Sequence, residues 1–206
     1  MKRTRVGILI FPGVEVLDFC GPFEVFSVAR MDEARRAEDP SPFEVLLVSE
    51  SLDPVSAMGG MRVLPDHTLT SCPLLDVLLV PGGPGVRGDA IRQHVIDWIA
   101  ERSRQVATLT CVCTGATLLG RAGLLDGRRA TTHWAWLDWL RQHFPAVTVE
   151  DRLNVVEDGD LLTSAGISAG IDMALHVVRR IHGEAVARAT ARRMEYPYPD
   201  DNRRRV

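Results

Sequence analysis

Apolar and β-branched residues of this chain fall into short runs, separated by stretches in which the apolar residues are spaced as in a helix. The runs are rich in Val, Ile and Leu and lack the alternation of a strand with one face in water, so they predict strands buried on both faces. The predicted strands comprise residues 6–11, 43–48, 77–80, 106–112 and 161–165, with shorter strands at 147–149 and 154–157 and a small hairpin formed by 55–56 and 62–64.

Between these runs, apolar residues recur every three or four positions, which is typical of helices with one buried face. Because strands and helices alternate along the chain, we expect an α/β fold, a mainly parallel sheet with helices on both faces. The first predicted helix starts near Gly21, the second spans 89–104, and the third starts at Thr114, directly after Cys113. A fourth helix buries a stripe formed by Trp134, Leu137 and Leu140. After a flexible loop at 166–170, a fifth helix buries Ile171, Ala174, Leu175, Val178 and Ile181, and a short sixth helix starts at Glu184.

The length of 206 residues is enough for one domain with a sizeable core, and no repeat or linker divides the chain. We therefore expect a single domain over residues 1–195 and an irregular tail over 196–206. The tail contains three consecutive arginines at 203–205, which we expect to solvate this end of the chain rather than to bind a partner.

Composition excludes several classes of partner. The net charge of −3 argues against non-specific binding of nucleic acid, and the sequence has no apolar run of about 18 residues that would span a membrane. The basic residues 1–5 precede an apolar run that stops at Pro12-Gly13, which favours a strand over a signal peptide. The four cysteines, Cys20, Cys72, Cys111 and Cys113, lack the spacing of a zinc site and fit a reducing cytoplasm, so we expect neither a metal nor a cofactor.

The strongest candidate for chemistry is Cys113, which lies where the strand 106–112 runs directly into a helix. Such a junction forms a nucleophile elbow, a tight turn that projects one side chain out of the sheet. The small Gly115 lets the helix start close to the strand, and the helix N-terminus should lower the pKa of the thiol. The alternative is a structural cysteine buried in the core, which is the interpretation that we prefer for Cys111.

Two further features follow strands of the same predicted sheet. Asp18 lies in an apolar loop after the first strand, where a carboxylate needs a partner or a raised pKa, although it could instead cap the helix near Gly21. The glycine-rich stretch 82–85 follows the strand 77–80. Since sites in such sheets lie at the carboxyl ends of the strands, Asp18, this loop and Cys113 should meet at one edge.

These stretches resemble the ThiJ/PfpI superfamily, and within it they are most similar to the isocyanide (isonitrile) hydratase branch. The resemblance implies a flavodoxin-like three-layer sandwich with a cysteine nucleophile elbow. The matching motifs are Ile10-Phe-Pro-Gly13, Leu17-Asp-Phe-Cys-Gly-Pro22, Val80-Pro-Gly-Gly-Pro-Gly85, Val112-Cys-Thr-Gly115, Ala122-Gly-Leu-Leu-Asp-Gly127, Ala130-Thr-Thr-His-Trp134 and Ala165-Gly-Ile-Ser-Ala-Gly-Ile-Asp172.

The resemblance also assigns roles to residues. It implies that Cys113 is the nucleophile, Asp18 its carboxylate partner and Thr114 a neighbour of both, and that the backbone N–H groups of Gly83 and Thr114 form an anion hole. Proteases of the superfamily place a histidine directly after the cysteine, where this chain has Thr114, so peptidase activity is not expected. His133 is interpreted as part of a structural turn from strand to helix.

The expected function is the cysteine-dependent hydration of a small electrophile, an isocyanide that becomes an N-formamide. The resemblance further implies a homodimer with its sites near the interface. One alternative is a non-enzymatic ligand-sensing or redox-responsive module, related to the amidotransferase-like domain of AraC-type regulators. Those regulators carry a helix-turn-helix after this domain, which we do not expect in these 206 residues. A glyoxalase-like stress protein is a third possibility.

Overall fold

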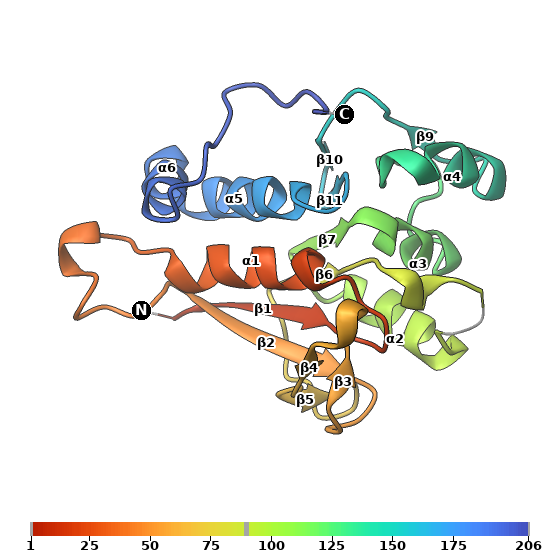
Figure 1. The fold of residues 1–206 in the computed structure, drawn as a ribbon, viewed down its shortest axis with the longest axis horizontal. Coiled ribbons are helices and arrows are strands. Elements are labelled where there is room, and N and C mark those ends of the chain that lie inside the picture. The colour runs from red at the N-terminus through yellow and green to blue at the C-terminus, as the bar shows by residue number, and fades with distance from the viewer. Residues whose placement is uncertain (1, 89–90, 206) are drawn as a thin grey trace.

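A seven-stranded sheet forms the centre of the protein in the computed structural model, which describes residues 2–88 and 91–205 (Figure 1). Its strand order is β10-β11-β7-β6-β1-β2-β5, and every neighbouring pair is parallel except β10 and β11. The strands of this sheet are β1 (Thr4–Leu9), β2 (Phe43–Ser49), β5 (His67–Thr68), β6 (Val77–Val80), β7 (Thr108–Val112), β10 (Val155–Asp158) and β11 (Leu161–Ser164).

Helices cover both faces of the sheet. The connection β1–α1–β2 runs along the sheet in the direction opposite to β6–α2–β7, and right-handed crossovers then place α1 and α2 on opposite faces. Helices α1, α5 and α6 pack together, and α2 packs against α3. The helices are α1 (Val16–Val28), α2 (Gln93–Ser103), α3 (Ala116–Arg121), α4 (Leu137–His143), α5 (Ala169–His182) and α6 (Glu184–Arg193).

The predicted fold class, a mainly parallel α/β sandwich of three layers, is confirmed. Every residue of β6 and β7 is buried, because both strands lie inside the sheet and have helices over each face. The predicted hairpin is present as β3 (Val55–Ser56) and β4 (Arg62–Val63), and a second small sheet pairs β8 (Arg129–Ala130) with β9 (Thr148–Val149).

Four local predictions are wrong. Helix α1 begins at Val16 and continues through Pro22, so Asp18 lies in its first turn and not in a loop. Trp134 is 60 % exposed, because it belongs to a short 3-10 turn before α4 and not to a buried stripe. Helix α5 begins at Ala169, which shortens the predicted loop at 166–170. The predicted start of the helix at Asp89 lies outside the described residues, but α2 begins only at Gln93, so Ile91 and Arg92 are not helical as predicted.

The tail also differs from its prediction. It is irregular from Tyr196 onward, but it passes beside α5 and ends next to β10 (Figure 1), where its arginines are bound to other parts of the chain. Arg204 donates to the carbonyl of Thr132, and Arg205 forms an ion pair with Asp172. These arginines therefore bind partners distant in sequence, which a pattern of charges does not reveal.

Among residues 2–88 and 91–205, no helix combines the length and the apolar character needed to cross a bilayer.

Candidate active site

Cys113 occupies the junction between β7 and α3. Its backbone adopts φ 57°, in the left-handed region that residues with a side chain rarely occupy, as expected for a strained nucleophile elbow. A 3-10 turn, Cys113–Gly115, leads into α3. Gly115 lies so close to the carbonyl oxygen of Val80 that any side chain there would clash with it. This close approach brings the end of β6 beside the thiol.

Thr114 connects the elbow to the glycine-rich loop that follows β6. Its hydroxyl oxygen accepts a hydrogen bond of 3.0 Å from the backbone N–H of Gly83. Its own backbone N–H and its hydroxyl group both form hydrogen bonds to the sulfur of Cys113, which favours the thiolate. The N–H of Gly83 is therefore already occupied by Thr114, and it can serve an anion only if that bond breaks.

Asp18 reaches the same edge of the sheet from the first turn of α1. Its side chain is fully buried, and its Oδ2 accepts a hydrogen bond of 2.9 Å from the backbone N–H of Gly82. Its other oxygen, Oδ1, is buried without a partner of ordinary geometry among the described residues, and the neighbouring group that can donate to it is the Cys113 thiol. Asp18, Thr114, the glycine loop and Cys113 thus meet as predicted.

Burial is the main cause that raises the pKa of Asp18 from 3.8 to about 7. The backbone N–H of Gly82 opposes this rise, the negative charge of Glu15 adds to it, and the neighbouring Cys113 thiol opposes it again. Near neutral pH the carboxyl group therefore exchanges a proton readily, which is the property required of a general acid and base.

The prediction of a lowered thiol pKa is wrong. Burial raises the pKa of Cys113 well above its usual range, and the negative charge of Asp18 raises it further. The hydrogen bonds from Thr114 act in the opposite direction but are smaller effects. The helix after the elbow begins at Ala116, beyond the 3-10 turn that contains Cys113, so the sulfur does not lie directly at its first turn. Cys111 is completely buried in β7, as predicted.

A second wall of the site comes from residues that sequence reasoning did not select. A Cβ atom built on Gly166 would lie 2.6 Å from the Cys113 sulfur and 2.8 Å from Cδ2 of His133, so the sulfur and the imidazole border the same small space. The hydroxyl of Thr132 donates to the carbonyl oxygen of Cys113 over 2.7 Å. The motifs 130–134 and 165–172 contain these residues, and only the fold shows that both motifs border the thiol.

The His133 ring has a structural role that matches its interpretation as part of a turn. Its Nδ1 accepts a hydrogen bond of 3.2 Å from the backbone N–H of Ala135 and so caps the 3-10 turn Trp134–Trp136. Burial lowers the pKa of His133, and the charge of Arg204 lowers it further, which favours the neutral ring. With Nδ1 as the acceptor, the proton of that neutral ring lies on Nε2.

The assembled groups are suited to adding a thiol across an electrophile. A sulfur nucleophile is held beside a carboxyl group that can take up or release a proton near neutral pH. Within residues 2–88 and 91–205 there is no group of three His, Cys, Asp or Glu side chains that could hold a metal ion.

Comparison with known proteins agrees with this architecture. The chain is 40% identical over 192 residues to the isonitrile hydratase of Pseudomonas putida, a match that covers 93% of this chain and 78% of that protein. It is 35% identical over 180 residues to the HTH-type transcriptional regulator CdhR of Pseudomonas aeruginosa, covering 87% of this chain but only 51% of the regulator. The crystal structure of a ThiJ/PfpI family protein from Pseudomonas syringae superposes with a TM-score of 0.83 at 32% identity, over 98% of this chain and 78% of that one. Residues 4–180 match the DJ-1/PfpI family, and the chain belongs to that family.

Proposed function

We propose that this protein hydrates small isocyanides to N-formamides, with Cys113 as the nucleophile and Asp18 as the group that moves protons. The observation that carries the proposal is the fully buried Asp18 carboxyl, with a pKa raised to about 7, beside a thiol on a strained elbow. The relative from Pseudomonas putida, whose name describes an isonitrile hydratase, supports the same reaction.

Access to the thiol favours a slim reacting group. Cys113 is 5 % exposed, Thr114 is 6 % exposed and Asp18 is inaccessible. An isocyanide, R–N≡C, presents its terminal carbon at the end of a linear group, so that carbon can reach the sulfur while the substituent R stays outside. A carbonyl carbon with substituents on both sides would meet the walls formed by Gly166 and His133.

The first step forms a covalent intermediate. Because the thiol retains its proton at rest, the ionised form of Asp18 accepts that proton as the sulfur attacks the terminal carbon. Asp18 then delivers the proton to the same carbon. The product is a thioimidate, R–N=CH–S–Cys113, and the carboxyl group is ionised again. Taken together, the hydrogen and the sulfur of the thiol have added to one carbon atom.

The second step consumes water. Ionised Asp18 removes a proton from a water molecule whose oxygen adds to the thioimidate carbon, and that proton passes to the nitrogen. The resulting intermediate, R–NH–CH(OH)–S–Cys113, collapses when the C–S bond breaks. The hydroxyl proton returns through Asp18 to the sulfur, and the formamide R–NH–CHO leaves. One carboxyl group thus acts in turn as base and acid.

Thr114 fits this chemistry in the position where proteases of the family carry histidine. No amine leaves during hydration, so no residue has to protonate a departing nitrogen. The hydroxyl and the backbone N–H of Thr114 instead stabilise negative charge on the sulfur when the C–S bond forms and breaks. The backbone N–H of Gly83 holds the Thr114 hydroxyl in place, which is a positioning role, and it joins the proposed anion hole only if that bond breaks.

Product analysis tests the proposal. Purified protein incubated with a simple alkyl isocyanide should yield the matching N-formamide, identified by NMR, and Cys113→Ala should yield none. A ligand-sensing module would bind the isocyanide without releasing formamide, and a glyoxalase-like protein would convert a 2-oxoaldehyde instead. A homodimer stays a prediction, and sedimentation at micromolar concentration measures it.

A further inference from the structure

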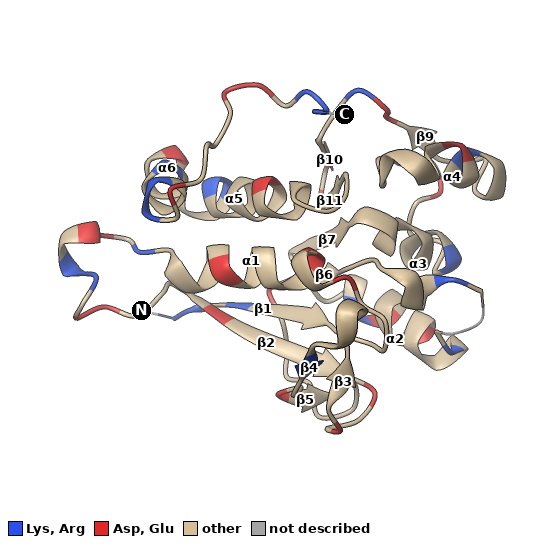
Figure 2. Cartoon of the chain, viewed as in Figure 1, with Lys and Arg blue, Asp and Glu red and all other residues tan. Residues whose placement is uncertain are grey.

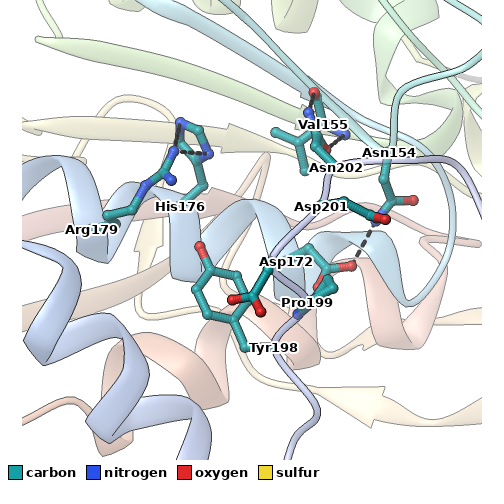
Figure 3. A pocket seen from close by; sticks show the side chains of 10 residues that line it. Asn154, Val155, Asp172, His176, Arg179, Tyr198, Pro199, Asp201 and Asn202 are labelled. Atoms are coloured by element: carbon teal, nitrogen blue, oxygen red, sulfur yellow. Dashed lines mark hydrogen bonds between the residues drawn. The ribbon is translucent and has the colours of Figure 1, made fainter.

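The tail pairs antiparallel with residues 152–154, which lead directly into the edge strand β10. The backbone of Arg203 forms an antiparallel β-bridge with Leu153, and the backbone N–H of Asn154 donates a hydrogen bond of 2.9 Å to the carbonyl of Asn202. The side chain of Asn202 bonds both backbone groups of Val155 (Figure 3). Its Oδ1 accepts a hydrogen bond from the N–H of Val155, and its Nδ2 donates one to the carbonyl of Val155. This pairing covers part of the exposed edge of the sheet and fixes the register of the arginines that follow.

Figure 2 shows an acidic stretch of the tail followed by a basic end beside β10. The side chain of Arg205 in that basic end donates a hydrogen bond of 3.0 Å to Asp172, a buried carboxylate on α5. Asn154 donates 2.6 Å to the other oxygen of Asp172 (Figure 3), and the hydroxyl of Tyr196 donates to the same oxygen as Arg205. The tail is therefore anchored to α5 as well as to β10.

The Arg204 guanidinium reaches the segment that forms one wall of the thiol site. Its Nη2 donates a hydrogen bond of 3.0 Å to the carbonyl of Thr132 and one of 2.5 Å to the hydroxyl of Thr131. Its Nε donates a hydrogen bond of 2.9 Å to the carbonyl of Asp151. The hydroxyl of Thr132 donates in turn to the carbonyl of Cys113. Only one residue, Thr132, thus separates the guanidinium from the backbone of the nucleophile.

We propose that Arg204 is a positioning residue for the Cys113 site, which holds Thr132 and thereby keeps the His133 ring against the thiol. The next residue after Thr132 is His133, whose ring borders the sulfur across Gly166. The planar guanidinium of Arg204 is itself held by three hydrogen bonds, one of which goes to the carbonyl of Thr132. This carbonyl therefore has little freedom to move, and the backbone that carries the His133 ring is held with it. Burial lowers the pKa of His133 and the positive charge of Arg204 lowers it further, so Arg204 also favours the neutral ring.

This proposal depends on Cys113 as the reacting group, and it builds on the proposed function only for the turnover measurement. The test compares Arg204→Met, which removes the charge and the donors, with Arg204→Lys, which keeps the charge but loses the planar fork. Arg203→Met is the matched control, because the exposed Arg203 side chain makes no hydrogen bond or ion pair with the described part of the chain. Arg205→Met tests whether tail anchoring alone is enough.

Three readouts are measured for each variant. The first is the rate at which iodoacetamide labels Cys113, followed on the Cys113 peptide by mass spectrometry. The second is the titration of His133 by NMR, assigned with His133→Gln. The third is the turnover of an alkyl isocyanide. In Arg204→Met, we expect labelling to become faster, the pKa of His133 to rise and kcat to fall by about 10-fold with a smaller change in KM, because the wall loosens and the thiol loses its fixed surroundings.

The lysine variant should keep the low His133 pKa and recover part of kcat, and the variants at Arg203 and Arg205 should resemble wild type. If Arg204→Met lowers the melting temperature but leaves all three readouts at wild-type values, the residue only anchors the tail and the proposal is wrong. It is also wrong if Arg205→Met changes the readouts as much as Arg204→Met. If wild type does not turn over isocyanides, the proposed function fails, while labelling and the His133 titration still decide the role of Arg204.

Discussion

Beside the larger effect of burial, the carboxylate of Asp18 raises the pKa of the Cys113 thiol, and the thiol, the neighbouring group that can donate to Asp18 Oδ1, opposes the rise in the pKa of Asp18. The two groups therefore titrate as a pair, in which one proton can reside on sulfur or on oxygen. The pair with one proton is the form proposed to attack an isocyanide. Three of the predictions below follow from this coupling.

The first prediction concerns the thiol. The pKa of Cys113, measured as the difference in thiolate absorbance between wild type and Cys113→Ala, should lie above the usual value of about 8.5. Asp18→Asn should move it down, because the neighbouring negative charge is gone, although burial remains. A thiol that titrates below 8.5 in wild type would mean that the helix N-terminus and Thr114 outweigh burial.

The second prediction concerns stability. The pKa of Asp18 is 3.8 in the unfolded chain and about 7 when folded, so the folded protein binds the proton more tightly and loses stability as pH rises through this range. Above pH 7, Asp18→Asn should therefore increase the free energy of unfolding by up to roughly 4 kcal/mol, the equivalent of the shift.

Urea unfolding at about pH 8 and pH 4 measures this effect. The difference between the two proteins should shrink at the lower pH, because the carboxyl is then protonated in the folded state and its unfolded-state pKa of 3.8 is nearly reached. The matched control is Asp126→Asn, which changes an exposed carboxylate. Equal stability of Asp18→Asn and wild type at pH 8 would show that the buried carboxylate carries no energetic cost.

The third prediction is the pH dependence of turnover. Below pH 7 both Asp18 and Cys113 carry protons, and the carboxyl cannot accept the thiol proton. The value of kcat/KM should therefore rise about tenfold per pH unit up to a pKa near 7 and then level off. A profile that falls through pH 7 would require a second proton on the pair, and one that rises only near 8.5 would remove Asp18 from the step.

The fourth prediction concerns Thr114. Thr114→Val keeps the shape of the side chain but removes the hydroxyl that bonds the sulfur and accepts from Gly83. We expect kcat/KM to fall by about 10- to 100-fold, the size of one hydrogen bond to a charged group, and stability to fall by about 1–3 kcal/mol from the unpaired N–H. Thr114→Ser is the control, since it retains the hydroxyl, and equal kinetics of the valine and serine variants would exclude the assigned role.

The sequence pattern predicted the fold and the meeting of Asp18, the glycine loop 82–85 and Cys113, because runs of apolar and β-branched residues such as 77–80 and 106–112 identify strands whose carboxyl ends share one edge. It misplaced Asp18 in a loop because Pro22 was taken as a first-turn residue, whereas α1 starts six residues earlier. It missed the sign of the Cys113 pKa shift, since the depth of burial depends on walls such as Gly166 and His133 that are distant in sequence. The tail arginines were misread for the same reason, because Thr132 and Asp172 are brought to them only by the fold.

The central claim is that Cys113 and Asp18 together hydrate an isocyanide, and infrared spectroscopy tests it most directly by following the N≡C stretch of a simple alkyl isocyanide over time. With wild type, the stretch should disappear while the amide band of the formamide grows at the same rate. Cys113→Ala should leave the stretch unchanged, and folded Asp18→Asn should slow its loss by roughly 100-fold or more, the scale of a lost general acid and base. Wild-type rates with Asp18→Asn, or an unchanged stretch with wild type, would contradict the account.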